Sequence, residues 1–522
     1  MKNRVFVDSI KVPVSACDEE IIAEAAKRLK KAGVNYNSSS LNIHKKSVDA
    51  RKRNNISFVC SVVGETEQGT SNTDGIRIKS TEEHSLVRGS EKMQGRPVIV
   101  GFGPAGIFCA MSLAEAGLCP IVLERGSAVD RRVEAIDSFY KTGVLNSECN
   151  IQFGAGGAGT FSDGKLTTRI GDYRCEYVLE KLHSLGAPDD IMWKAKPHIG
   201  TDILRDVIKK AAALIESFGG EIRYDTKVLA VSENSVTTED GIIEAGCVIL
   251  ATGHSARDVY EMLYNENFSV VAKPFSVGVR AEHLQEDIDR ALYGDPMLYE
   301  KLGHGEYQLS YRSGNRGVYS FCMCPGGEVM AATSEEWGVV TNGMSRYARN
   351  GANANAAIAV SVLPEDFGND PMKAIAFQRK LERSAYEAGG GEYYAPCQLM
   401  GNFLAGKKGD LKSKVKPSYM NGRVRAFELE KILPGFVTEY LKTGLRRFGK
   451  TIKGYDSCDA VLTGLETRTS APVRVLRGDN CVALGFANIY PCGEGAGYAG
   501  GIMSAAVDGL RVAEAVLSRF SN

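Results

Sequence analysis

The sequence predicts an α/β protein in which a nucleotide-binding domain is interrupted by a second, α+β domain. Three glycine-rich segments lead to this prediction, at residues 98–106, 249–253 and 490–501 of the 522-residue chain. In the first segment, an apolar run at residues 96–100 leads directly into the glycine turn at residues 101–106. A helical stretch at residues 105–116 follows. This order of strand, glycine turn and helix is that of a Rossmann-like unit.

The first segment has the residues that a pyrophosphate-binding turn needs. Gly101 allows the tight turn, Gly103 lets the backbone approach the phosphates, and Gly106 lets the helix pack closely on the strand. Pro104 suits the first helical turn, where its missing N–H costs no intrahelical bond. The N–H groups at the start of the helix, around Ala105, are then available to an anion.

An acidic residue follows at the position expected for ribose recognition. The apolar run at residues 120–123 ends in Glu124, at about the distance where a carboxylate accepts the ribose hydroxyls of a dinucleotide. Because a carboxylate repels a 2′-phosphate, NADP is disfavoured at this site.

The loop at residues 153–166 is also rich in glycine and formally contains a second G-x-G-x-x-G. It is not predicted to be a second dinucleotide turn, because Ser-Asp-Gly follows it rather than an apolar helix. We expect instead a backbone-lined loop that passes close to a flat ligand, at Gly157, Ala158 and Gly159, where side chains would collide.

The middle of the chain contains no further nucleotide fingerprint. A helix is predicted at residues 203–218, a β-meander of short strands between residues 221 and 238, and a strand at residues 246–250. Mixed strands and loops follow from about residue 255 to 481. A disulfide reductase with two dinucleotide domains is thereby excluded, because it would need another strand–glycine–helix unit.

The first 95 residues are predicted to form a separate βαβ, ferredoxin-like domain and a linker. Strands are expected at residues 5–14 and 56–63, with an amphipathic helix at residues 19–32 between them. The stretch between these elements is basic, with His-Lys-Lys at residues 44–46 and Arg-Lys-Arg at residues 51–53. Such a charge run is usually a solvated edge, and the alternative is a docking surface for a polyanion.

The composition agrees with a cytoplasmic enzyme. Lys and Arg number 63, as do Asp and Glu, so no overall basic field favours nucleic acid. The N-terminus lacks the apolar core of a signal peptide, and no run reaches membrane-spanning length. The 13 cysteines are scattered and odd in number, which favours reduced thiols over a disulfide framework. The single C-x-C, at Cys322 and Cys324, predicts no metal site.

Together, the glycine-rich segments resemble those of FAD enzymes that have a single nucleotide-binding domain. The match covers about residues 96–522 and is similar to uncharacterised FAD-dependent dehydrogenases of the NAD(FAD)-utilising type. The resemblance implies non-covalently bound FAD and three domains. These are an N-terminal domain with its linker at residues 1–95, an FAD-binding domain at residues 96–260 and 481–522, and a substrate or cap domain at residues 261–480.

The resemblance also implies which residues hold the cofactor. In the family a basic residue such as Arg132 approaches the pyrophosphate, a strand position such as Val228 touches the adenine, and the last glycine-rich segment turns under the ribityl chain. Many relatives have Asp where this chain has Glu494. The implied FAD-binding residues are Gly101, Gly103, Pro104, Ala105, Gly106, Glu124, Arg125, Arg132, Gly157, Ala158, Gly159, Val228, Ala251, Thr252, Gly253, Gly493, Glu494, Gly500, Gly501 and Ile502.

Five residues are candidates for the chemistry at the flavin ring. Lys165 and Arg169 follow the glycine loop and are suited to hold an anionic substrate or the flavin edge. His254 is a candidate acid or base near neutral pH. Cys322 and Cys324 are either a redox pair or small residues packed in a turn. The second alternative is favoured, because alternate residues on a regular strand lie near the upper limit of Cα separation for a disulfide.

Three classes of function stay open. The leading hypothesis is an oxidoreductase that passes a hydride between flavin N5 and an unidentified organic substrate, with NAD(P)H as a transient donor or a protein as donor. The second is a flavin monooxygenase. The third is an RNA-modifying or RNA-associated flavoprotein that docks through residues 44–53. The sequence predicts no particular substrate and no oligomeric state.

Overall fold

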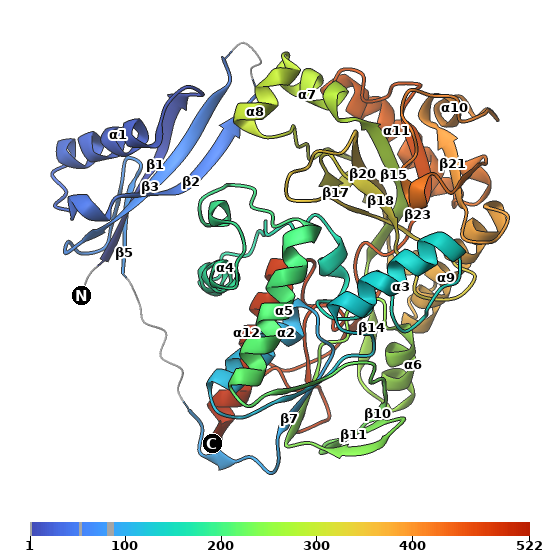
Figure 1. The fold of residues 1–522 in the computed structure, drawn as a ribbon, viewed down its shortest axis with the longest axis horizontal. Helices are drawn as coiled ribbons and strands as arrows, with labels where there is room; N and C mark the ends of the chain where they lie inside the picture. Colours follow the sequence, from blue (N-terminus) through green and yellow to red (C-terminus); the bar gives the residue numbers. More distant parts are fainter. Residues whose placement is uncertain (1–2, 52–54, 81–87, 522) are drawn as a thin grey trace.

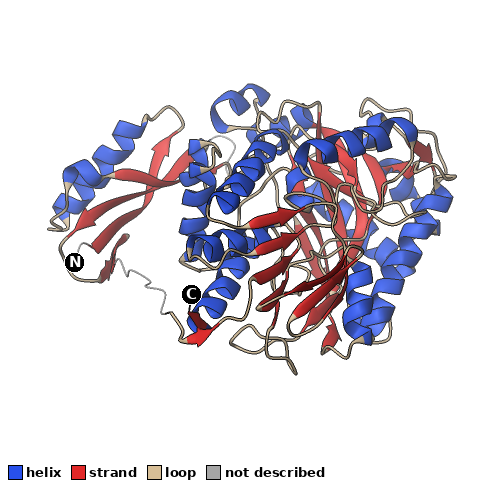
Figure 2. Cartoon of the chain, turned by 60° about the horizontal axis from the view of Figure 1, so that its bottom comes forward, coloured by secondary structure: helices blue, strands red, loops and turns tan. Residues whose placement is uncertain are grey.

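The computed structural model describes residues 3–51, 55–80 and 88–521, which form three parts (Figure 1). A small N-terminal domain stands to one side of a nucleotide-binding domain and a cap domain, which pack against each other. Helices lie on the outside and sheets inside in the two larger parts (Figure 2). Within the described residues, no helix is long and apolar enough to cross a membrane.

The nucleotide-binding domain is built on a five-stranded parallel sheet whose strand order is β25-β13-β7-β8-β9. Distant parts of the chain therefore meet in one sheet, and β7 and β13 lie at its centre. The strands are β7 (Pro97–Val100), β8 (Ile121–Leu123), β9 (Glu221–Arg223), β13 (Cys247–Leu250) and β25 (Ile489–Pro491).

One face of this sheet is covered by closely packed helices. They are α2 (Pro104–Glu115), α4 (Arg174–Ser184), α5 (Thr201–Ser217) and α12 (Ile502–Arg519). Helices α2 and α12 touch through their backbones, because a Cβ at Gly509 would lie only 2.2 Å from the carbonyl oxygen of Ala105. This contact sets the starts of both helices side by side at the carboxyl end of the sheet.

The other face carries a three-stranded antiparallel meander and α6 (Arg257–Asn265). The meander consists of β10 (Val228–Val231), β11 (Ser235–Thr238) and β12 (Gly241–Glu244). The predicted meander began one strand too early, because β9 pairs in parallel with β8 instead.

The cap domain is built on a seven-stranded sheet of order β16-β17-β20-β15-β23-β21-β22. Long helices α9 (Pro371–Ala388) and α11 (Gly435–Thr451), absent from the predicted strands and loops, pack on it. Its strands are β15 (Phe275–Leu284), β16 (Ser310–Ser313), β17 (Arg316–Cys324), β20 (Asn353–Val362), β21 (Ala395–Leu399), β22 (Val424–Ala426) and β23 (Val461–Glu466).

Smaller elements complete these two domains. Two short helices, α7 (Gln285–Tyr293) and α8 (Tyr299–Leu302), lie on the side of the cap nearest the N-terminal domain (Figure 1). The others are α3 (Val129–Thr142), α10 (Met400–Ala405), and three strand pairs: β6 (Glu91–Lys92) with β26 (Phe520–Ser521), β14 (Val270–Ala272) with β24 (Val473–Val475), and β18 (Glu328–Ala331) with β19 (Thr341–Met344).

The N-terminal domain is a five-stranded sheet of order β2-β3-β1-β5-β4 with α1 (Asp18–Lys31) on one face. Strand β3 lies antiparallel between β1 and β2, so the β1-α1-β2 unit is a split crossover, as in a ferredoxin-like sheet. A hairpin, β4–β5, replaces the second helix of that layout. The strands are β1 (Asn3–Pro13), β2 (Asn42–Asp49), β3 (Ser57–Thr66), β4 (Ser71–Thr73) and β5 (Ile76–Ser80).

The basic stretch is not a loop, because residues 44–46 lie on the edge strand β2. The backbone of Lys46 pairs there with residues 193–195 of the nucleotide-binding domain, and its ammonium group lies 2.9 Å from Asp18. Arg51 pairs with Asp49 at 2.7 Å, whereas residues 52 and 53 fall outside the described residues. Part of the predicted polyanion surface is therefore already bound to protein groups.

A buried cluster of charges joins the cap to the nucleotide-binding domain. The Glu382 carboxylate, on α9, accepts hydrogen bonds from Arg257 of α6 at 2.6 and 2.8 Å and from Arg468 at 2.8 and 3.1 Å. All three side chains are at most 7% exposed. Burial alone would raise the pKa of Glu382, but the two guanidinium groups hold it well below its ordinary value.

We expect Glu382→Gln to lower the free energy of unfolding by about 3 to 5 kcal/mol, because it removes the buried carboxylate that two guanidinium groups share and leaves them only the partly exposed Glu335. Urea denaturation at neutral pH measures this change. Glu387→Gln on the same helix is the control, since Glu387 forms only an exposed pair with Arg383 and should matter by less than about 0.5 kcal/mol. Equal effects of the two changes would contradict the role given to Glu382.

Candidate functional site

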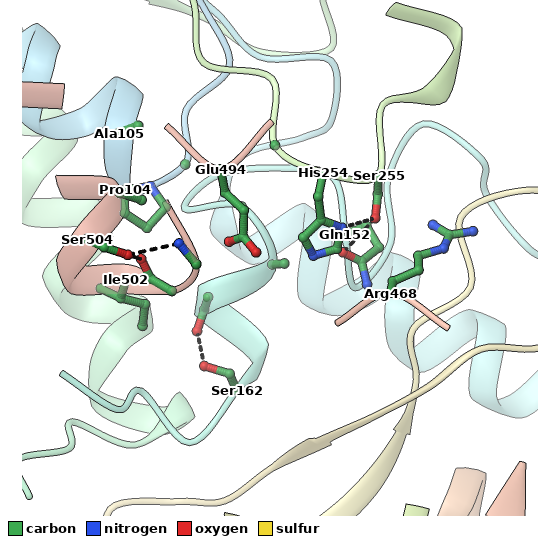
Figure 3. A pocket seen from close by; sticks show the side chains of 18 of the residues that line it. Pro104, Ala105, Gln152, Ser162, His254, Ser255, Arg468, Glu494, Ile502 and Ser504 are labelled. Atoms are coloured by element: carbon green, nitrogen blue, oxygen red, sulfur yellow. Dashed lines mark hydrogen bonds between the residues drawn. The ribbon is translucent and has the colours of Figure 1, made fainter. Parts of the chain in front are cut away.

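A cavity of about 640 Å³ lies at the carboxyl ends of β7, β8 and β13, where the cap domain covers the nucleotide-binding domain. Its walls come from the β7–α2 turn, the glycine loop at residues 152–169, the segment after β13 and the start of α12. Strand β17 and residues 306–308 contribute the cap side. Figure 3 shows Glu494 between the Pro104 turn and His254, with Arg468 beyond.

The β7–α2 turn has the geometry of a phosphate cradle. Gly101 has φ +104°, and a Cβ there would lie 2.4 Å from the carbonyl oxygen of Ala251. A Cβ at Gly106 would lie 2.0 Å from the carbonyl oxygen of Gly101, so both positions require glycine. Gly103 lines the cavity, and its Cβ would meet only Gly157, at an ordinary contact distance of 3.9 Å.

Two helices begin at this cavity. Helix α2 starts at Pro104 and α12 starts at Ile502, and both of these residues line the wall. Unpaired N–H groups and the positive ends of two helix dipoles thus converge on one space. This donor set suits a dianionic pyrophosphate and the electron-rich edge of a reduced ring.

Glu124 makes contacts that the sequence did not predict. Its carboxylate accepts backbone N–H groups from Phe102 at 2.8 Å, Gly126 at 3.0 Å and Gly154 at 2.9 Å. Glu124 lines the cavity, as ribose recognition requires, but it also fastens the phosphate turn to the glycine loop. The loop folds back over the end of β8, which residue spacing does not show.

Arg132 corrects the prediction, because it is fully buried and does not line the cavity. Its guanidinium group donates to backbone carbonyls at 2.7 to 3.1 Å and so holds the glycine loop in shape. Burial lowers the pKa of Arg132 to about 10, so the group stays charged at neutral pH. The accepting residues are Asn150, Ile151, Gly154, Ala155 and Gly157.

The glycine loop lies against the phosphate turn, as expected for a loop beside a flat ligand. Gly157 has φ +63°, and a Cβ there would approach Cα of Gly103 to 3.0 Å. Gly157, Ala158 and Gly159 all line the cavity.

His254 was predicted to be an acid or base near neutral pH, but its surroundings keep it neutral at that pH. Its Nδ1 lies 3.0 Å from Oγ of Ser255, whose hydroxyl donates to Gln152 at 3.1 Å. Burial lowers the pKa of His254 to about 4, assisted by Arg468 and Arg257. The imidazole is therefore neutral at pH 7 and offers one donor and one acceptor rather than a proton that titrates near neutrality.

Lys165 lies at the cavity wall within a cluster of charges. It forms an ion pair with the buried Asp163, whose carboxylate also accepts from Arg349 at 2.7 Å. Burial would raise the pKa of Asp163, but Lys165 and Arg349 hold it well below its ordinary value. Arg169 and Lys196 line the same cavity, so this part of the wall carries three cationic side chains, of which Lys165 and Lys196 have carboxylate partners in Asp163 and Glu306.

The last glycine-rich segment is held by an ion pair that the sequence analysis missed. Asp508 of α12 accepts the N–H of Gly493 at 2.7 Å and pairs with Arg477 at 2.6 Å. Asp508 is an isolated charge in an apolar stretch of α12. Its partners, Arg477 and Gly493, lie far from it in the sequence, so the sequence does not show what it binds. Glu494, next in the turn, lines the cavity, and burial raises its pKa to about 7.

Most of the predicted FAD-binding residues lie at one cavity. Arg125 lines it and is anchored by Asp258 at 3.0 Å. The predicted residues that do not line it are Gly106, Arg132, Gly493 and Cys324. Those that do, besides the residues already placed, are Ala105, Val228, Ala251, Thr252, Gly253, Gly500, Gly501 and Cys322.

The residues that line the cavity fit FAD, and a family match also indicates an FAD-dependent protein. Residues 274–469 match a family model described as FAD-dependent protein, C-terminal domain-like, and residues 7–63 match a domain of unknown function. An uncharacterised protein of Clostridium beijerinckii (strain ATCC 51743 / NCIMB 8052) is 48% identical over 501 residues, which cover 92% of this chain and 93% of that protein. The protein is a flavoprotein in class. It belongs to the same family as the clostridial protein, and its cap domain matches the FAD-dependent family model.

Solved structures show only a distant likeness. Glycine oxidase from Geobacillus kaustophilus is 12% identical, with 82% of this chain and 96% of that chain covered and a TM-score of 0.32. L-amino acid deaminase from Proteus vulgaris is 13% identical, with 83% and 96% covered and a TM-score of 0.33. Scores this low carry no argument about substrate.

Glu494 predicts a pH dependence of stability. Because its pKa is about 7 in the folded protein and 4.5 as the ordinary value, the folded state holds the proton more tightly. The stability contributed by this group is full below about pH 4.5 and falls as the pH rises to about 7. Glu494→Gln should therefore raise the Tm of the apoprotein at pH 8 and leave it nearly unchanged at pH 5.

Thermal unfolding of the apoprotein at the two pH values measures this difference. Glu239→Gln, in the exposed turn between β11 and β12, is the control and should change Tm equally at both. A Glu494→Gln effect of the same size at pH 5 and pH 8 would show that the carboxyl is ionised throughout.

Proposed function

We propose that the protein is an FAD-dependent oxidoreductase of the dehydrogenase type, which exchanges a hydride between flavin N5 and a small organic substrate. One observation carries this proposal. A single cavity is bounded on one side by a phosphate cradle and two helix N-termini, and on the other by polar side chains of the cap domain. A cofactor that spans the cradle would meet a substrate beneath the cap.

Different residues along the cavity would bind different parts of FAD. The turn from Gly101 to Ala105 would hold the pyrophosphate, with Glu124 and Val228 toward the ribose and adenine. The start of α12 would stabilise negative charge on the ring. When bound, FAD supplies reversible two-electron chemistry.

The cationic side chains of the cavity wall favour an anionic substrate. Lys165, Arg169 and Lys196 place positive charge at the cavity wall, and Arg468 adds a guanidinium group whose partner Glu382 is shared with Arg257. Neutral His254 would orient a substrate oxygen by hydrogen bonding rather than by carrying charge. A carboxylate close to the carbon that exchanges the hydride fits this arrangement, and NAD(P)H is the proposed transient electron donor when that carbon is reduced.

No observation favours the two other hypotheses. Among the described residues, no feature of the cavity distinguishes a monooxygenase from a dehydrogenase. Docking to RNA through residues 44–53 stays a prediction, with Lys46 engaged by Asp18 and by the nucleotide-binding domain.

The purified protein should be yellow and release unmodified FAD on denaturation. Gly103→Asp should remain folded but lose FAD, because a carboxylate at the cavity wall repels the pyrophosphate. Gly103→Ala is the matched control and should keep the flavin, since a Cβ at this position makes only an ordinary contact of 3.9 Å.

FAD occupancy, from the ratio of flavin to protein absorbance, is the measurement, with circular dichroism to confirm folding. Full occupancy in Gly103→Asp would mean that the phosphates bind elsewhere. A colourless wild-type protein that FAD does not reconstitute would contradict the proposed function itself.

A further inference from the structure

We propose that Cys322 and Cys324 form a redox-active pair that exchanges two electrons with the flavin. The pair would be a second redox centre of the same active site, so this inference rests on the proposed function. The sequence favoured two packed thiols instead, on the geometry of a regular strand. The structure changes that balance through three independent features of the segment.

The first feature is position. Cys322 lines the cavity, together with its neighbours Ser320, Phe321 and Met323, whereas Cys324 lies fully buried behind it. The strand β17 is irregular here, because its register with β20 shifts between Phe321 and Cys324. The regular spacing that would keep two alternate thiols apart therefore does not apply, and the Sγ of Cys324 turns back to donate to the carbonyl oxygen of Cys322 at 3.3 Å.

The second feature is a buried cation held against the pair. Arg280 of β15 is fully buried, and its Nη2 donates to the carbonyl oxygen of Cys322 at 2.7 Å and lies 3.9 Å from Sγ of Cys324. Its Nη1 donates to Glu466 at 2.9 Å, and its Nε donates to Asn355 at 2.9 Å. These contacts hold the guanidinium group against the Cys322 backbone and the Cys324 sulfur, and a cation beside a cysteine stabilises a thiolate.

The charges around Cys322 favour its thiolate form. The neighbouring Cys324 side chain lowers the pKa of Cys322 to about 7, against the effect of burial and with help from Arg280 and Lys165. Asp163 acts in the opposite direction. By contrast, burial raises the pKa of the Cys247 and Cys397 thiols to about 12. Cys322 is therefore set apart from ordinary buried cysteines of this chain.

The third feature is a strained backbone. Cys322 has φ +45°, in the left-handed region that a residue with a Cβ rarely adopts. Such a conformation is strained and is held by the surrounding structure, often at functional sites. Here it turns the thiol-bearing residue at the point where β17 meets the cavity.

The proposed step is balanced. The Cys322 thiolate and the Cys324 thiol form one S–S bond and release one proton and two electrons. Bound FAD would supply the acceptor for these two electrons and the proton. The reverse step reduces the disulfide, so the pair can receive electrons from reduced flavin and pass them to a substrate at the cavity.

A reductive titration of the air-oxidised holoprotein with dithionite, under anaerobic conditions, tests this exchange. We expect four electrons to be consumed per FAD, two by the flavin and two by the disulfide. Cys322→Ala and Cys324→Ala should each consume two. Cys397→Ala, which removes a buried thiol from β21 of the same sheet, is the matched control and should consume four.

Mass spectrometry provides a readout that needs no variant. Trypsin releases residues 317–346 as one peptide, in which Cys322 and Cys324 are the only cysteines. After rapid alkylation, this peptide should lack two hydrogens and carry no label in the oxidised protein, and should carry two labels after reduction. In the apoprotein, the pH at which iodoacetamide labels Cys322 at half its maximal rate should be near 7, and Cys324→Ala should raise it.

The outcomes separate this inference from the proposed function. Consumption of two electrons per FAD by the wild type, with two labels on the peptide in both states, would overturn the redox pair while leaving the flavoprotein intact. A protein that binds no FAD would overturn the proposed function. Four electrons per FAD in both cysteine variants would assign the extra pair of electrons to other groups and would also overturn the inference.

Discussion

One buried carboxylate, that of Glu382, holds the two halves of the site together. It binds Arg257, which follows the nucleotide-binding strand β13 almost directly, and Arg468, which follows the cap strand β23. Both guanidinium groups are buried, and Glu382 is the buried anion that they share, with the partly exposed Glu335 beside them. The cap and the nucleotide-binding domain are joined here, and Arg468 also lines the cavity.

Single buried charged side chains also hold the other walls of the site in place. Arg132 holds the glycine loop from behind through backbone carbonyls, and Glu124 holds it from the front through backbone N–H groups. Asp508 fixes the turn below α12, and Arg280 fixes the end of β17. Each group is buried and tied to backbone at fixed distances, which keeps the cavity walls in place without a bound ligand.

The sequence predicted the parts of this site that are set by local chemistry. The turn at Gly101 to Gly106 could be identified because strand, glycines and helix are contiguous, and the segments at residues 249–253 and 490–501 indicated their shared location. The contacts of Arg132 and Glu124 could not be predicted, because they depend on how a loop some 20 to 30 residues away folds back. Strand β2 was missed because its residues are polar and half exposed on an edge. The proposed pairing of Cys322 with Cys324 depends on a shift in the register between β17 and β20. The residue types in this segment do not predict that shift.

A crystal structure of the holoprotein tests the central claim most directly, because it shows where FAD lies relative to this cavity. The account predicts the pyrophosphate at the turn from Gly101 to Ala105, the adenine near Val228, and the isoalloxazine ring beneath Cys322 and Lys165. Flavin density outside the cavity, or a cofactor bound with its adenine toward the cap domain, would contradict it.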